Sequence, residues 1–194
     1  VRFYELLGFI PKTISNFTKN VEMIFNKKRD LLIVVGGGSL PPSMYDRPHE
    51  DELQPNRDRM EEQVIHYCVA HGIPIIATCR GMQYINVMFG GKLWYHPKLP
   101  VTRTRGMDHQ VWLVKEQRNI WVNNYHSDCI YEEGLAPCFE PLAIDRENHV
   151  VEAYGSDEMK ILALQWHPER RFETANAYEE TRKIVLDFIQ KHVK

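Results

Sequence analysis

Short apolar runs alternate with helical patterns in the first half of the chain. Residues 31–35 and 73–77 are continuous apolar runs, which is typical of strands buried on both faces of a parallel sheet. Residues 57–70 carry apolar side chains on one helical face, and residues 80–89 follow the second run as another helix. Residues 39–56, which contain four prolines, are expected to form a surface loop. This alternation predicts an α/β fold.

The segment before the first apolar run is less regular. Residues 2–9 are expected to be the end of a helix that Gly8 closes. Residues 10–15 are a candidate strand, and Asn16 is a candidate cap for a helix that continues to Phe25.

The second half is rich in strand-like segments, and it ends in an amphipathic helix at residues 174–193. The strand candidates are residues 109–114, 120–123, 140–145, 150–153 and 161–166. We predict a single domain over residues 1–194, with an open, mainly parallel sheet, helices on both faces and an added β-rich section. Such a sheet is expected to begin with a strand, whereas this chain begins with Val1 in a helical segment. We therefore expect the first strand to be missing, because the sequence is a fragment or its start was assigned downstream of the true one.

The composition excludes several classes of function. The chain has 194 residues and a formal net charge of −2, so neither nucleic acid nor an anionic membrane is an expected partner. No apolar run approaches the ~20 residues of a membrane span, and no signal peptide is recognisable. The four cysteines lack a regular spacing and are expected to be reduced thiols of a cytoplasmic protein. The scattered histidines show no ligand spacing, so no metal or other cofactor is expected.

Cys79 stands between the second apolar run and the helix that follows it. A tight strand-to-helix turn lifts a nucleophile above the edge of the sheet, and it favours small residues two positions away, here Ala77 and Gly81. The free N–H groups at the start of the next helix favour a thiolate over a thiol. The alternative interpretation of Cys79 is a buried, inert cysteine.

A His167-Pro168-Glu169 segment follows the last strand candidate. Ligand sites of open α/β sheets lie at the carboxyl ends of the strands, so His167 is expected near Cys79. A neutral imidazole can accept the thiol proton and later protonate a leaving amine, and Glu169 can orient the ring. By itself His-Pro-Glu is as often an ordinary loop, but its pairing with Cys79 favours an active site.

An acyl-transfer site also needs N–H groups that stabilise an oxyanion. The backbone N–H of Arg80 directly follows the nucleophile, and Gly37 or Gly38 ends the neighbouring strand, where glycine allows close approach of the backbone. The alternative is a simple strand-ending turn. No Gly-Lys-Ser/Thr helix start follows these glycines, which excludes a phosphate-binding P-loop.

Several segments, in this order, resemble those of class I glutamine amidotransferases. They are Ala-Thr-Cys79-Arg-Gly-Met-Gln83, Asn86 with Gly90-Gly91-Lys-Leu, Val-Asn-Asn124-Tyr125-His126, and Gln-Trp-His167-Pro-Glu169. Within that family the chain is most similar to the γ-glutamyl hydrolase-like branch (peptidase C26-like), which includes γ-glutamyl-γ-aminobutyrate hydrolases. The likeness spans roughly residues 31 to 170, and only the combination of segments is specific. It implies a flavodoxin-like sheet, a Cys79–His167–Glu169 triad, and a γ-glutamyl thioester on Cys79 that water hydrolyses.

The same resemblance implies further roles. Gln83 and the Tyr125-His126 segment match positions that hold the α-amino and carboxylate ends of the glutamyl group. Arg57, in Asn-Arg-Asp-x-x-Glu61, matches a motif of the branch and is a candidate substrate contact. An ion-paired helix start explains Arg57 at least as well.

The chain departs from the family's pattern at three positions in addition to the missing first strand. Ala77 replaces the usual glycine two residues before the cysteine, and Asp128 replaces a frequent glutamine. Ser39-Leu40 stands where a pair such as Asn-Asp is common, which leaves the choice of oxyanion glycine open. His109 also matches the branch, and we interpret it as structural.

Four functions fit this resemblance. The first is a free-standing hydrolase of a γ-glutamyl amide, and the second is a glutaminase subunit that passes ammonia to a synthase partner. The third follows from a likeness of Asn-Arg-Asp, Phe-Gly-Gly-Lys-Leu and Trp-His-Pro-Glu-Arg to amidohydrolases of capsule phosphoramidate synthesis, which act on a γ-glutamyl nucleotide amidate. The fourth is an inactive scaffold, against which the intact Cys/His/Glu set argues. The expected ligand is a γ-glutamyl amide or glutamine, and the sequence does not indicate an oligomeric state.

Overall fold

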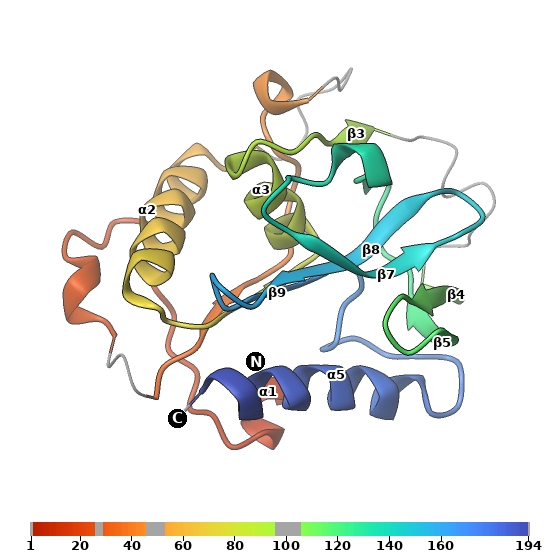
Figure 1. The fold of residues 1–194 in the computed structure, drawn as a ribbon. Helices are drawn as coiled ribbons and strands as arrows, with labels where there is room; N and C mark the ends of the chain where they lie inside the picture. Colours follow the sequence, from red (N-terminus) through yellow and green to blue (C-terminus); the bar gives the residue numbers. More distant parts are fainter. Residues whose placement is uncertain (1, 26–28, 46–52, 96–105, 194) are drawn as a thin grey trace.

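A seven-stranded sheet forms the centre of the fold (Figure 1). The computed structural model describes residues 2–25, 29–45, 53–95 and 106–193. The order of strands in the sheet is β1-β2-β9-β8-β7-β4-β5. The strands are β1 (Leu32–Val34), β2 (Ile75–Thr78), β4 (Asp108–Leu113), β5 (Arg118–Asn123), β7 (Glu140–Asp145), β8 (Val150–Ser156) and β9 (Ile161–Leu164). A separate two-stranded sheet pairs β3 (Trp94–Tyr95) with β6 (Asp128–Cys129).

The parallel strands are those that bring the candidate site together. β2 pairs in parallel with β1 on one side and with β9 on the other, so that Ala77 lies beside Val34 and Ala163. The remaining pairs, from β9 to β5, are antiparallel. The predicted β-rich section therefore extends the same sheet, while parallel pairing is confined to β1, β2 and β9.

Helices cover both faces of the sheet, as predicted (Figure 1). They are α1 (Arg2–Leu6), α2 (Pro55–His71), α3 (Arg80–Met88) and α5 (Ala177–His192), with short 3-10 turns η1 (Val21–Met23), η2 (Pro42–Met44) and η3 (Glu132–Gly134). α2 and α3 lie on one face, and α1 and α5 lie on the other. The fold class predicted from the sequence is thus confirmed.

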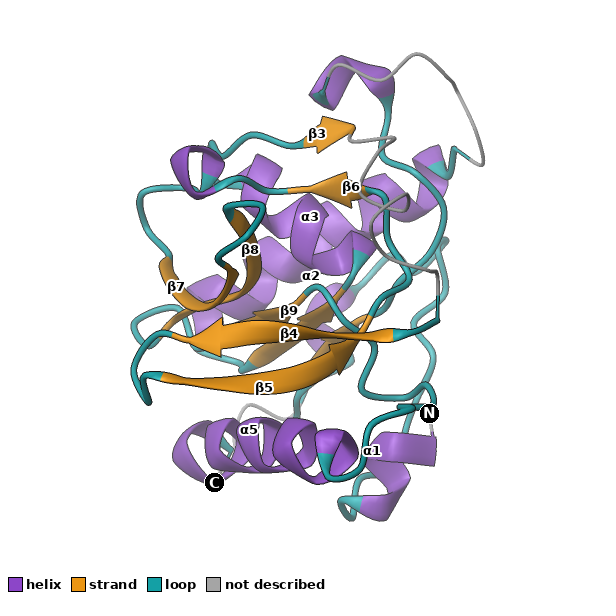
Figure 2. Cartoon of the chain, turned by 90° about the vertical axis from the view of Figure 1, so that its right-hand side faces the viewer, coloured by secondary structure: helices purple, strands orange, loops and turns teal. Residues whose placement is uncertain are grey.

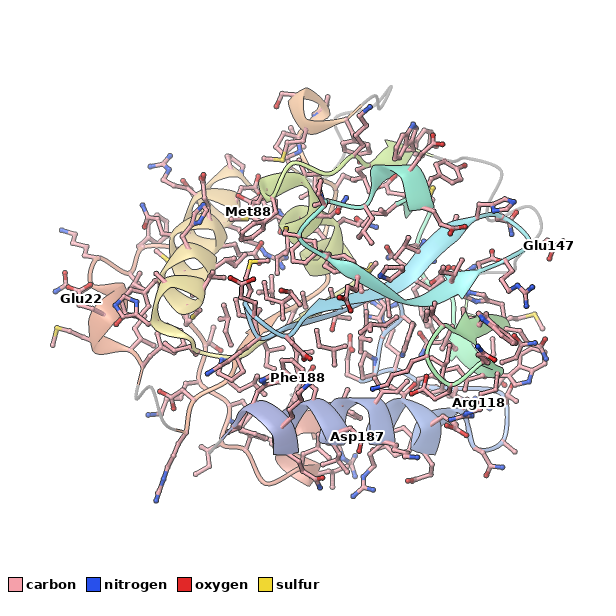
Figure 3. All side chains as sticks on the ribbon, viewed as in Figure 1. Glu22, Met88, Arg118, Glu147, Asp187 and Phe188 are labelled. Carbon is pink, nitrogen blue, oxygen red and sulfur yellow. The ribbon has the colours of Figure 1, made fainter. Side chains whose placement is uncertain are left out.

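Each face of the sheet has its own apolar core. Val64 of α2 and Ile85 of α3 are buried in one core, and Phe3 of α1 and Val185 of α5 in the other. Phe188 lies on the side of α5 that faces the sheet (Figure 3). Burial of such side chains is the dominant favourable contribution to folding, about 1.5–3 kcal/mol for each large one.

The end of the sheet formed by β5 is attached to α5. Figure 2 shows β5 next to α5, and the guanidinium of Arg118 donates to both carboxylate oxygens of Glu180 at 3.0 and 2.7 Å. The buried Trp166, which follows β9, donates its indole N–H to the Thr181 hydroxyl at 3.1 Å. The segment that follows β9 is therefore anchored on α5.

Two predictions for the N-terminal segment are wrong. Residues 10–15 form no strand. The side chain of Ile10 is 88% exposed, so an extended conformation there would gain no burial against a neighbouring strand. The helix expected from Asn16 to Phe25 is reduced to η1, which starts after Asn20. Short helices are marginal without a packed apolar face, and Val21 is the buried residue of that turn. Among the described residues, none before β1 is in a strand.

Candidate active site

Cys79 is the single residue between β2 and α3, and its backbone is strained. Its φ is 52° and its ψ is −110°, a conformation that L-residues rarely adopt. Hydrogen bonds on both sides of Cys79 maintain this strained conformation. The Cys79 N–H donates to Leu164 O at 2.7 Å, and the Gln83 N–H donates to Cys79 O at 3.1 Å. A strained strand-to-helix turn of this kind is how α/β enzymes present a nucleophile.

The small residues expected around this turn are required by packing. A Cβ atom on Gly81 would overlap the carbonyl oxygen of Val34 and lie 2.8 Å from Val34 Cγ1. The first turn of α3 therefore lies directly against the end of β1, which a larger residue would prevent. Ala77 is fully buried in β2.

Burial dominates the acidity of the Cys79 thiol. It raises the pKa of Cys79 to about 11, although a hydrogen bond from the Arg80 backbone N–H and the charge of Arg170 act in the opposite direction. The helix start does favour the thiolate, as expected, but the net effect in the free protein favours the thiol. The Arg80 N–H does point at the sulfur, but desolvation outweighs it.

His167 and Glu169 form a hydrogen-bonded pair directly after β9. His167 Nδ1 lies 2.6 Å from Glu169 Oε1. Partial burial would raise the pKa of Glu169, but the hydrogen bond and charge of His167 lower it below the usual range. With a proton on Nδ1 for this hydrogen bond, Nε2 is the imidazole nitrogen that can accept another.

Gly36 lies where Cys79 and His167 meet. A Cβ on Gly36 would lie 3.6 Å from Cys79 Cβ, 3.6 Å from His167 Nε2 and 2.8 Å from His167 Cε1. The structure thus brings the predicted thiol and imidazole together beside the glycine loop. Gly37 and Gly38 stay predictions for the oxyanion hole, and Gly36 is a further candidate because it lies beside both side chains.

A network of charged side chains ties the glycine loop to the start of α3. Arg57 donates to Gly36 O at 3.1 Å and to Val35 O at 2.5 Å, and its Nε donates to Glu61 at 2.6 Å. The second oxygen of Glu61 accepts from the buried Arg80 at 2.6 Å, and Arg80 also pairs with Asp58.

This network places the Arg57 guanidinium against the backbone of the glycine loop. A Cβ on Gly37 would overlap the Arg57 guanidinium and approach Arg80 Cδ at 3.3 Å. The ion pair of Arg57 with Glu61 confirms the helix-start interpretation. Its hydrogen bonds to Val35 O and Gly36 O also give Arg57 a role in positioning the loop, and its contact with substrate stays a prediction.

The predicted glutamyl-binding residues differ in their surroundings. Tyr125 is at the site, with its ring edge-on to His167 at 5.6 Å between centroids, and the guanidinium of Arg170 lies 4.3 Å from the Tyr125 ring centroid. Gln83 is buried one turn into α3 and donates to Asp128 O at 3.1 Å and to Gln165 Oε1 at 3.2 Å.

The imidazole of His126 points into the protein interior. Its Nε2 lies 3.6 Å from Oε1 of the fully buried Glu152, and His109 Nε2 lies 3.3 Å from the same oxygen. Burial opposes ionisation of Glu152, but the two imidazoles hold its pKa well below the usual range. This cluster fits the structural interpretation of His109 and holds the His126 ring beside Glu152.

Sequence reasoning missed Asn123, the last residue of β5. Its side-chain amide accepts from the His167 N–H at 2.9 Å and donates to His167 O at 2.9 Å. It also gave no role to Arg170, although this residue ends the Trp-His-Pro-Glu-Arg segment quoted above. Contacts of this kind depend on strands that are distant in the sequence.

Some features are not found in the part of the chain that the structure describes. There, no group of three or more His, Cys, Asp or Glu side chains is arranged to hold a metal ion. No helix in residues 2–25, 29–45, 53–95 and 106–193 is long and apolar enough to cross a membrane. The four cysteines all lie within these ranges and form no disulfide with one another, and Cys138 is the exposed one.

The profile of the peptidase C26 family matches residues 10–169. Protein NtpR of Enterococcus hirae is 30% identical over 181 residues, which cover 82% of this chain and 71% of that protein. The γ-glutamyl-γ-aminobutyrate hydrolase PuuD of Escherichia coli is 26% identical over 175 residues, covering 77% of this chain and 67% of PuuD. A solved structure from Thermoplasma acidophilum, described as a candidate GMP synthase subunit, has the same fold. Its TM-score is 0.70 at 22% identity, over 98% of this chain and 84% of that one.

Proposed function

The chain belongs to the peptidase C26 family, and we propose that it is a cysteine-dependent hydrolase of a γ-glutamyl amide, which it cleaves to glutamate and an amine. One observation carries the proposal: the strained turn at Cys79 and the imidazole of His167 both lie beside Gly36, and His167 Nδ1 is hydrogen-bonded to Glu169. The γ-glutamyl bond is supported by the likeness to γ-glutamyl-γ-aminobutyrate hydrolases. In this proposal Cys79, His167 and Glu169 are the catalytic residues.

The first half of the reaction forms the thioester. Because burial holds Cys79 as a thiol, its proton moves to His167 Nε2 while the sulfur attacks the γ-carbonyl carbon. Glu169 stabilises the resulting imidazolium through Nδ1. The negative charge that develops on the carbonyl oxygen is stabilised by the N–H of Arg80 and by N–H groups of the loop at residues 36–38.

The second half regenerates the enzyme. The tetrahedral intermediate collapses, the C–N bond breaks, and His167 gives its proton to the leaving amine. His167 then takes a proton from water, and the hydroxide attacks the thioester carbonyl carbon. Collapse breaks the C–S bond, the sulfur recovers its proton from His167, and glutamate leaves. The mechanism requires no metal or organic cofactor.

The glutamyl group has a binding surface in this proposal. Tyr125 lies against the catalytic imidazole, and Gln83 lies one turn beyond Cys79 in α3, next to Asp128. We assign these residues to the glutamyl moiety and give His126 the supporting role of holding the segment that carries Tyr125.

Glutamate release from a panel of γ-glutamyl amides tests the proposal. The purified protein should release glutamate without a partner, and Cys79→Ala should abolish release while its melting temperature remains that of a folded protein. An electrophilic glutamine analogue such as 6-diazo-5-oxo-L-norleucine should label Cys79 and leave Cys68, Cys129 and Cys138 unlabelled in peptide mass spectra. Turnover retained by Cys79→Ala would overturn the mechanism. Ammonia release from glutamine that needs a second protein would instead support a glutaminase subunit.

A further inference from the structure

Gln165 opens the Gln-Trp-His167-Pro-Glu169 segment, and the proposed mechanism gives it no role. It directly follows β9, and the side chains on either side of it, Leu164 and Trp166, are buried in the core shared with α5. Because side chains alternate between the two faces of an extended chain, Gln165 points to the other face, where α3 lies. Its side chain is fully buried there, and its Oε1 accepts a hydrogen bond from Gln83 Nε2 at 3.2 Å.

This contact helps to fix the orientation of the Gln83 amide. Gln83 Nε2 also donates to the backbone carbonyl oxygen of Asp128 at 3.1 Å. A backbone carbonyl only accepts hydrogen bonds, so the NH2 end of the Gln83 amide, and not its oxygen, lies against Asp128. Gln165 Oε1 takes the second hydrogen of that NH2 group. Gln83 Oε1 lies on the opposite side of the amide, and it accepts no hydrogen bond from the residues that the structure describes.

The free oxygen of this amide belongs to the side of α3 that carries the nucleophile. Gln83 stands one helical turn beyond Cys79, and residues four apart share a face of a helix. Helical side chains lean toward the N-terminus of their helix, so the Gln83 amide is directed back toward the turn at Cys79. An amide oxygen only accepts hydrogen bonds, and an ammonium group only donates them. The orientation of Gln83 therefore suits the α-ammonium end of a glutamyl group.

Packing alone does not explain a glutamine at position 165. Its Nε2 is buried and has no hydrogen-bond partner among the described residues. A buried donor without a partner destabilises a fold, and an apolar side chain of similar length would avoid that penalty. The acceptor at the other end of the same amide, which holds Gln83, gives a reason for a glutamine here.

We infer that Gln165 is a positioning residue for substrate selection: it holds the Gln83 amide with Oε1 toward the site, so that γ-glutamyl amides with a free α-amino group are preferred over counterparts with an α-hydroxyl group. The inference rests on the proposed function and on the assignment of Gln83 to the glutamyl group, and it adds the residue that sets the orientation of Gln83. A hydroxyl group donates and accepts, so it can bind an amide in either orientation, whereas an ammonium group needs the oxygen.

A pair of substrates tests this inference. The pair is the γ-glutamyl amide that the wild type hydrolyses fastest and the same amide with a hydroxyl group in place of the α-amino group. The readout is the ratio of kcat/KM for the amino compound to kcat/KM for the hydroxy compound. The wild type should favour the amino compound at least about tenfold, and Gln165→Met should lower the ratio by about 3- to 10-fold, the effect of one lost hydrogen bond. Gln165→Glu keeps an acceptor oxygen, so its ratio should be no lower than that of the wild type.

Two further variants separate positioning from a purely structural effect. In a Gln83→Met background, Gln165→Met should not lower the ratio further, because Gln165 acts through Gln83. Gln190→Met changes an exposed glutamine of α5 and should leave the ratio at the wild-type value.

The outcomes distinguish this inference from the proposed function. A ratio that falls in Gln165→Met and not in Gln165→Glu supports the inference. An unchanged ratio in Gln165→Met, a further fall in the Gln83→Met background, or a wild type that hydrolyses both compounds equally overturns it and leaves the hydrolase intact. If thermal denaturation shows that Gln165→Met does not fold, Gln165→Glu decides, because a lowered ratio in that variant also overturns the inference. A protein that hydrolyses no amide and is not labelled at Cys79 overturns the proposed function itself.

Discussion

The side-chain amide of Asn123 holds the main chain of His167 on both sides, with two hydrogen bonds of 2.9 Å. One runs from the His167 N–H to Asn123 Oδ1, and the other from Asn123 Nδ2 to His167 O. Asn123 ends β5, at the edge of the sheet, whereas His167 follows β9 in the interior of the sheet. The position of the proposed base is thus set by a residue four strands away.

Replacing Asn123 by aspartate should impair catalysis through this contact. The variant loses the donor to His167 O and places a carboxylate in a buried position. We expect the free energy of unfolding to fall by about 1–3 kcal/mol and kcat to fall at least about tenfold. Urea denaturation and steady-state kinetics measure the two effects. Asn119→Asp, exposed on the same strand, should change neither, and wild-type kcat in Asn123→Asp would contradict the positioning role.

Glu61 should matter for kcat because it joins the two sources of the proposed oxyanion hole. Its carboxylate bridges Arg57, which holds the carbonyl groups of Val35 and Gly36, and Arg80, which follows the nucleophile. In Glu61→Gln both guanidiniums lose this charged partner, so the loop and the start of α3 are less firmly held together. We expect kcat to fall about tenfold while KM changes less, since transition-state contacts are those affected.

The neighbouring residue offers a matched control for that experiment. Glu62→Gln removes the same charge from an exposed position of α2 and should leave kcat and KM unchanged. Glu61→Asp keeps the charge and should recover part of kcat. A Glu61→Gln variant that raises KM and leaves kcat intact would show that Glu61 acts on substrate binding instead.

The reactivity of Cys79 should depend on the reagent. Burial raises the pKa of Cys79 to about 11, so little thiolate exists at neutral pH in the free protein, and raising the pH toward that value should increase its alkylation. Iodoacetamide at pH 7 should therefore modify exposed Cys138 before Cys79. Peptide mass spectrometry over time measures the order in which the two cysteines are alkylated. The glutamine analogue should reverse this order, because substrate recognition brings it to Cys79. Rapid alkylation of Cys79 by iodoacetamide at pH 7 would contradict the thiol resting state.

Glu152 should make the fold sensitive to acid. Its pKa is held below the unfolded value, so the ionised carboxylate stabilises the fold above the ordinary pKa of glutamate. That contribution is lost as the pH falls from this value toward the lower pKa of the folded state. Glu152→Gln should cost about 3 kcal/mol at pH 7 and flatten the loss of stability below pH 5, measured by urea denaturation across pH. Exposed Glu147→Gln should alter neither quantity, and an unflattened profile in Glu152→Gln would assign the acid sensitivity elsewhere.

Local patterns were enough to predict the elements that carry the proposed nucleophile and base. The apolar runs became β1 and β2, and the last strand candidate became β9, because buried strands of a parallel sheet need apolar residues on both faces. The N-terminal segment shows the limit of such patterns. Ile10 has a suitable residue type for a strand, but its side chain is 88% exposed and no described strand pairs with residues 10–15.

Local sequence patterns were sufficient to propose the chemistry: a cysteine at a tight turn, an imidazole with a carboxylate two residues on, and glycines where the backbone must approach closely. These features depend on residues that are close in the chain, so they can be interpreted from the sequence before the fold is known. The folded chain was needed to show that Gly36 lies beside Cys79 and His167, that Asn123 binds the main chain of His167, and that the His126 ring lies beside Glu152. Each of those relationships joins segments that are far apart in the sequence. They are brought together by the order of the strands and the direction of the side chains, and local residue spacing predicts neither of these.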